Sequence, residues 1–115
     1  MNAIVQPALD GSVPSAKKTA TRQRAEDYAL WVEIVRPVFE NVARTGRRFT
    51  SWEIADEHKL PDPPFPQSQW GRLVGLLRDE GLIEAVGWAN SDRPGDHGSA
   101  VKVWRGTAAA RRAAA

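Results

Sequence analysis

The chain has 115 residues, 42% hydrophobic and 26% charged, with a formal net charge of +2 and no cysteine. This length suggests a single domain, and the lack of cysteine excludes disulfides and thiolate metal sites. Its apolar runs are far too short to cross a membrane. Residues 1–15 also lack the basic and apolar segments of a secretion signal. We therefore expect a cytoplasmic protein with no membrane partner.

The composition divides the chain into three parts. Residues 1–21 contain two prolines, a glycine and two adjacent lysines, which is typical of a flexible arm. Nearly all large apolar side chains lie between Tyr28 and Arg105, so we take residues 22–107 as one domain. Residues 108–115 are alanine and arginine, and we expect a disordered or frayed basic tail.

The first predicted helix begins near Gln23 and carries apolar residues at three- and four-residue spacing. Pro37 interrupts this pattern and should kink or divide the helix, because proline removes a donor and clashes with the preceding turn. Gly46 is suited to end it. The expected buried face is Tyr28, Trp31, Val32, Val35, Val38, Phe39, Val42 and Ala43.

A second, short helix is expected from Ser51 to about His58. Thr50 and Glu53 have the three-residue spacing of a capping box. We expect Phe49, just before it, to contribute to the sheet. Four prolines between residues 59 and 66 forbid regular helix there.

A third helix is expected over Ser68–Glu80, capped by Ser68 and ended by Gly81. Two short strands should follow, at residues 82–86 and 101–104, joined by a polar loop at residues 90–99. Trp88 and Trp104 fall on the two arms of this hairpin, where they could pair and fix its register. If exposed, they would instead offer stacking surfaces for unpaired bases.

These elements predict a mainly α fold with a small β-hairpin (α+β). Their order is that of a winged helix-turn-helix, with three to four helices and a two- or three-stranded antiparallel wing sheet. The connection before the third helix is longer than the tight turn of the simplest helix-turn-helix.

Residues suited to catalysis are few, and we expect no enzyme, no cofactor and no metal. The only histidines are His58 and His97. His97 lies near Asp92 and Asp96, but the spacing matches no known metal site. The sequence contains no glycine-rich phosphate loop or nucleophile elbow.

Basic and amide residues instead suggest contact with DNA. Gln67, Ser68, Gln69 and Arg72 begin the third helix, where recognition helices meet base edges. The remaining candidates contact phosphates in this hypothesis, and an ordinary solvated surface is the alternative for each group. They are Arg47 and Arg48, then Arg93, His97 and Lys102 at the wing, and then Lys17, Lys18, Arg22, Arg24, Arg111 and Arg112 on the arms.

Three segments resemble small winged-helix proteins encoded by actinobacterial phages and prophages. They are residues 44–50, 79–84 and 101–107, and the resemblance covers roughly residues 28–107. The closing strand, which ends in Val-Trp-Arg-Gly, is its most specific part. The resemblance implies a DNA-binding fold with a role in regulation, replication or excision, in the bacterial host's cytoplasm.

The leading hypothesis is a non-enzymatic protein that binds DNA, which we expect to be double-stranded, as a monomer or homodimer. Helix 68–80 would read the major groove, while wing 89–100 and the basic arms would contact phosphates. The rival is a protein-interaction module that binds and modulates a host protein. The low net charge favours this rival, as do acids near the expected DNA face at Asp56, Glu57, Asp79 and Glu80.

Overall fold

The computed structural model describes residues 7–113, with side chains from residue 19 onward. In these residues, four helices accompany a two-stranded antiparallel sheet, which confirms the expected mixed α+β composition. The elements are α1 (Pro7–Thr45), α2 (Ser51–Glu57), α3 (Pro66–Asp79), β2 (Ile83–Asn90), β3 (Ala100–Gly106) and α4 (Ala108–Ala113). Within this described part, no helix is long and apolar enough to cross a membrane.

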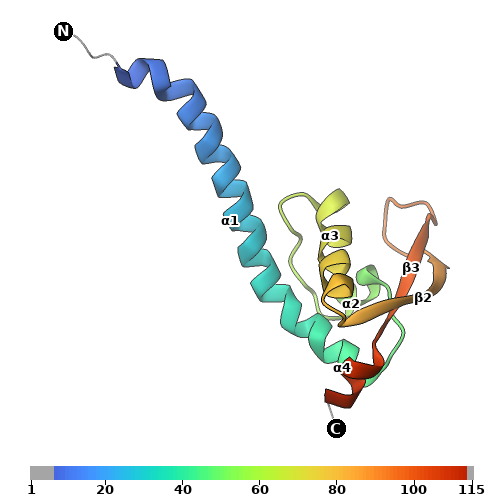
Figure 1. The fold of residues 1–115 in the computed structure, drawn as a ribbon. Coiled ribbons are helices and arrows are strands. Elements are labelled where there is room, and N and C mark those ends of the chain that lie inside the picture. Colours follow the sequence, from blue (N-terminus) through green and yellow to red (C-terminus); the bar gives the residue numbers. More distant parts are fainter. Residues whose placement is uncertain (1–6, 114–115) are drawn as a thin grey trace.

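Helix α1 is one continuous helix of 39 residues whose N-terminal half extends away from the other elements (Figure 1). Residues 7–21, expected as a flexible arm, belong to this helix, and residues 1–6 lie outside the described residues. The helix also continues through Pro37, so the expected division there is wrong. Pro37 is exposed, and the core contacts of Val35 and Phe39 hold the turns on either side of it.

The core lies where the C-terminal half of α1 meets α2, α3 and the hairpin. The predicted apolar face of α1 is confirmed, with Trp31, Val35 and Phe39 buried against the other elements. The ring of Trp31 meets that of Trp70 edge-on, with centroids 4.8 Å apart. Its indole nitrogen donates a hydrogen bond of 2.7 Å to the Pro61 carbonyl, which ties the proline-rich connection to α1.

The predicted start of α2 is confirmed in detail. The Thr50 hydroxyl accepts a hydrogen bond of 3.3 Å from the Glu53 N–H, and the Glu53 carboxylate accepts one of 2.8 Å from the Thr50 N–H. The expected contribution of Phe49 is also confirmed, because it forms an antiparallel bridge with Trp104. Through this bridge the chain before α2 is joined to β3.

Helix α3 begins two residues earlier than expected, at Pro66, so Ser68 is not its cap. Phe65 occupies the cap position without a side-chain hydrogen bond. The free Phe65 N–H is satisfied by the Gln69 side-chain oxygen at 2.8 Å. At the other end, Gly81 has the positive φ of 79° expected after the helix.

The hairpin has a register that the sequence did not reveal. One extra residue, Val86, lies between Ala85 and Gly87 as a β-bulge. As a result, Trp88 is opposite Lys102 and Trp104 is opposite Ala85, so the expected Trp88–Trp104 pair is wrong. Both tryptophans nevertheless lie on one face of the sheet, because opposed residues share a face and alternate residues return to it.

The expected frayed tail is wrong for residues 108–113, which form α4 and pack against α1. Ala110 is buried, and the Thr107 hydroxyl accepts a hydrogen bond of 3.2 Å from its N–H. Gly106 lets the chain approach α1, since a Cβ there would come within 1.8 Å of the Ala43 carbonyl oxygen. Residues 114 and 115 lie outside the described residues.

Candidate nucleic-acid interface

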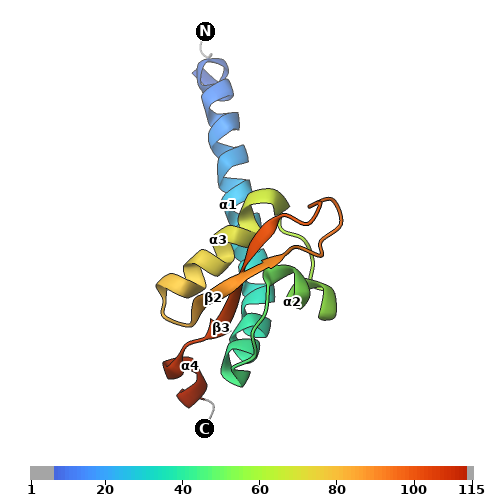
Figure 2. The ribbon, with the colours of Figure 1, turned by 90° about the vertical axis from the view of Figure 1, so that its right-hand side faces the viewer.

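A groove of about 840 Å³ separates α3 from the hairpin and reaches the start of α2. The N-terminus of α3 and the loop between β2 and β3 lie at the same end of the molecule, as Figures 1 and 2 both show. Four of the five tryptophans line the groove: Trp52, Trp70, Trp88 and Trp104.

Two of the α3 residues that line the groove are glycines spaced one turn apart, so this wall carries no side chain at these two positions. A Cβ at Gly71 would meet no atom within 4 Å, and one at Gly75 would meet only the end of Arg78 at 4.0 Å. Internal packing therefore does not require glycine at either position. Gln67 lines the groove at the N-terminal end of this wall and Arg78 near its C-terminal end.

Hydrogen bonds within the loop at residues 91–99 give it a defined shape. The buried Ser91 donates from its hydroxyl to the Asp96 carboxylate at 2.6 Å, and its hydroxyl accepts from the Arg93 N–H at 3.1 Å. The Ser99 N–H donates to the Asp96 carbonyl at 3.0 Å. These contacts hold the Arg93 backbone beside the groove.

Two cations of the hairpin side lie over aromatic rings. The Lys102 ammonium is 6.0 Å from the ring centroid of Trp88 and 5.7 Å from that of Trp104. The Arg93 guanidinium is 5.7 Å from the ring centroid of Trp52. Such contacts orient a cation without neutralising it, so both residues keep a full positive charge beside the groove.

The charge of the groove is positive. Its lining includes Arg78, Arg93 and Lys102, against a single carboxylate, Asp96, which already accepts the Ser91 hydroxyl. Arg78 is partly offset by its neighbour Asp79, whose carboxylate lies 3.0 Å away. A groove with this balance attracts anionic groups such as phosphates.

The four candidates on α3 do not form one surface. Gln67 and Ser68 are exposed, and of the two only Gln67 lines the groove. Gln69 is buried, and its side-chain oxygen is bound to Phe65. Arg72 faces α1, where its guanidinium lies 4.5 Å from the ring centroid of Tyr28.

Tyr28 is affected by both its surroundings and this arginine. Partial burial raises the pKa of its hydroxyl, and the positive charge of Arg72 opposes that rise. Arg72 therefore has a partner within the fold, and it is directed away from the groove.

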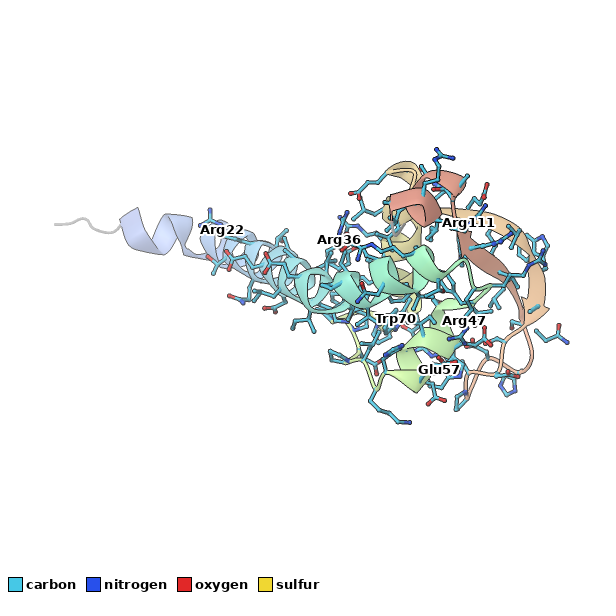
Figure 3. The ribbon with its side chains drawn as sticks, turned by 90° about the horizontal axis from the view of Figure 1, so that it is seen from below. Arg22, Arg36, Arg47, Glu57, Trp70 and Arg111 are labelled. Atoms are coloured by element: carbon cyan, nitrogen blue, oxygen red, sulfur yellow. The ribbon has the colours of Figure 1, made fainter. Side chains whose placement is uncertain are left out.

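The candidates before α2 differ from one another. Arg47 forms a two-pronged ion pair with Glu57, in which Nη1 lies 2.7 Å from Oε1 (Figure 3). This hydrogen bonding lowers the pKa of the Glu57 carboxyl. Arg48 is exposed, and it forms no ion pair or hydrogen bond with any residue that the structure describes.

The basic arms do not converge on the groove. Arg22 and Arg24 are exposed on the extended half of α1, whereas α4 lies at the end of the molecule opposite the hairpin loop (Figures 1 and 2). Arg111 donates to the Gly106 carbonyl at 2.8 Å, and Arg112 is exposed. The side chains of Lys17 and Lys18 lie outside those described.

His97 is exposed in the loop with a positive φ of 52°, and it does not line the groove. Asp96, its neighbour, is engaged by Ser91. Among residues 19–113, no group of three histidine, cysteine, aspartate or glutamate side chains could hold a metal ion.

Sequence reasoning did not identify Gly71, Gly75 and Arg78 as residues that line the groove. The two glycines were a usable signal, because glycine is the poorest helix former after proline and two occur one turn apart in a single helix. The position of Arg78 at the groove depends on how the hairpin folds back beside α3, which no local pattern reveals.

Comparison of the chain with protein-family models, curated proteins and solved structures gave no significant match.

Proposed function

We propose that the chain is a winged helix-turn-helix protein that binds duplex DNA. In this proposal α2 and α3 form the helix-turn-helix and the β2–β3 hairpin forms the wing. The bridge between Phe49 and Trp104 supports it, because it joins the segment before α2 to the returning strand of the hairpin.

The observation that carries the proposal is the meeting of the α3 N-terminus and the hairpin loop at one positively charged groove. Residues near the start of a recognition helix are those that meet base edges. Gln67 and Ser68 have this position and are exposed. Arg93 and Lys102 stand across the groove, where they would contact phosphates.

The proposed contact set is accordingly narrower than the sequence alone indicates. It comprises Gln67, Ser68, Arg48, Arg93 and Lys102. Gln69 is left out because it is buried and its side-chain oxygen is bound to Phe65, and Arg72 is left out because its guanidinium lies over Tyr28 of α1 and it does not line the groove. Arg47 would first have to release Glu57.

Salt-dependent anisotropy with labelled random duplex DNA tests the proposal. We expect a Kd of about micromolar at low salt, which rises steeply with salt because bound counterions are released. Duplex DNA that stays unbound at low salt would refute it.

A charge-matched pair of variants locates the interface. Arg93→Ala should weaken binding to every sequence and lower the slope of log Kd against log salt by about one. Arg112→Ala makes the same change of charge on α4, at the opposite end of the molecule, and should leave the slope unchanged. Equal effects of both variants would mean that only net charge matters.

A second candidate function is a protein-interaction module that binds a host protein. Leu30 and Ile34, one turn apart on α1, are 58% and 60% exposed, and they support this candidate. A partner retained at salt high enough to strip DNA, and lost in a Leu30→Glu/Ile34→Glu variant, would favour it over DNA binding.

A further inference from the structure

Trp88 is a large aromatic side chain left open to solvent in the middle of a strand. It is 68% exposed, whereas Trp104 on the same face of the hairpin is 5% exposed. Its ring borders the groove, and Lys102 lies opposite it in the neighbouring strand. An exposed tryptophan beside a positive groove is available to stack on a ligand.

The β-bulge determines which way Trp88 points. Residues two apart in a strand share a face. If Val86 were paired regularly instead of bulged, Trp88 would be opposite Val101 and would lie on the other face from Trp104. Bulges commonly redirect a side chain next to a binding site. Here the bulge brings Trp88, Lys102 and Trp104 to one face, the face that borders the groove.

The opposite wall leaves room for a flat group. Gly71 and Gly75 stand there without packing against anything that would exclude a side chain. Glycine is costly inside a helix, and close approach of a ligand to the backbone is one reason for using it. The α3 wall therefore offers backbone surface to the same groove that the Trp88 ring borders.

The size of the groove suits one or two unpaired nucleotides. About 840 Å³ is within the range of pockets that enclose a drug-sized ligand. A nucleotide or two of single strand is of that size, whereas a duplex is much wider than such a pocket. Aromatic rings with cations beside them are also the usual means of holding single strands.

We propose that the groove between α3 and the hairpin binds single-stranded DNA, with an unpaired base stacked on Trp88 and the adjoining phosphates on Lys102, Arg93 and Arg78. The inference rests on the proposed function only in taking DNA as the ligand. The duplex would be held at the mouth of the groove and the single strand within it.

The test compares a labelled single strand of mixed sequence with the same strand annealed to its complement. Trp88→Ala should weaken single-strand binding about tenfold to a hundredfold, the range found when base-stacking aromatics are removed. Trp88→Phe retains a stacking ring and should lower the single-strand affinity only a few-fold. Duplex affinity should change little in either variant, and since Trp88 is exposed both should fold.

Gly71→Leu is a second, independent variant. It fills the groove from the α3 side while replacing glycine by a good helix former, so its melting temperature should not fall. We expect weaker single-strand binding and nearly unchanged duplex binding.

Each outcome is decisive. Unchanged single-strand affinity in Trp88→Ala overturns the inference, and if Arg93→Ala still weakens duplex binding, the proposed function stands. Equal losses on single strand and duplex also overturn it. Tighter binding to RNA of the same sequence, or displacement by polyglutamate as readily as by unlabelled single strand, would assign the groove to another ligand. Single-strand binding with no duplex binding supports the inference and removes the duplex proposal.

Discussion

The two ends of this molecule use the same kinds of residue for opposite purposes. At the α4 end, two arginines are bound to the backbone: Arg105 donates to the Gly46 carbonyl at 2.8 Å, and Arg111 donates to the Gly106 carbonyl at 2.8 Å. At the hairpin end, the side-chain cations of Arg93 and Lys102 lie over aromatic rings and form no ion pair with any described residue. The guanidinium groups of Arg105 and Arg111 are thus bound within the fold, whereas the cations of Arg93 and Lys102 are available to a ligand.

Glycines show the same contrast. Gly106 is buried at the α4 end, where α1 leaves no space for a side chain. Gly71 is exposed at the groove and has open space around it. Packing explains the first glycine, whereas the second has no explanation inside the fold.

The largest effect is expected at Gly106. Gly106→Ala puts a methyl group 1.8 Å from the Ala43 carbonyl oxygen, so the chain must shift and unfolding should become easier by about 3 kcal/mol or more. Urea denaturation measures this change. Gly87→Ala is the matched control in the same sheet, since a Cβ there meets nothing within 4 Å. Equal losses in both variants would mean that α1 and β3 are not closely packed at this point.

This closed end is also where sequence reasoning failed. The capping box at Thr50 could be predicted because its two partners are three residues apart. The packing of α4 depends instead on the approach of Gly106 to Ala43, more than sixty residues apart along the chain, and no local pattern encodes it. A short run of alanine and arginine therefore resembled a tail.

The groove could be predicted only in outline. The order of helices and strands follows from local periodicity and turn residues, and so does the exposed start of α3. The face of Trp88 depends on one bulged residue, Val86, which changes the register without changing the hydrophobic pattern. Gln69 was expected on the polar side of α3. Its side-chain oxygen instead accepts a hydrogen bond from the Phe65 N–H, at the end of the proline-rich connection.

A smaller loss is expected at the start of α4. The Thr107 hydroxyl donates to the Gly81 carbonyl at 2.7 Å and accepts from the Ala110 N–H. Thr107→Val keeps the side-chain shape but removes both bonds, and should lower the free energy of unfolding by about 1–2 kcal/mol. Thr21→Val, exposed on the extended half of α1, serves as the control and should cost less.

At the groove, replacing a glycine should increase stability rather than lower it. Gly71→Ala adds a methyl group in open space and removes a glycine from a helix. We expect the free energy of unfolding to rise by about 0.5–1 kcal/mol. Denaturation of this variant beside Gly106→Ala tests the contrast directly. A loss of stability at Gly71 would show that its wall is packed rather than open.

The smallest expected effect is a pH dependence of the Arg36–Glu80 pair, which joins α1 to the end of α3. Hydrogen bonding to Arg36 lowers the pKa of the Glu80 carboxyl below its usual value of 4.5. The folded state therefore binds this proton less readily than the unfolded chain. The pair's contribution is present above pH 4.5 and is lost as the pH falls through the lowered pKa. Because the pair is partly exposed, the effect should be small and should weaken in salt.

Glu80→Gln should remove that part of the acid sensitivity, whereas Asp62→Asn, at an exposed residue in the proline-rich connection, should leave it in place. Melting curves between pH 3 and 6 would measure both, and parallel curves for Glu80→Gln and the native chain would show that the pair does not hold α1 against α3.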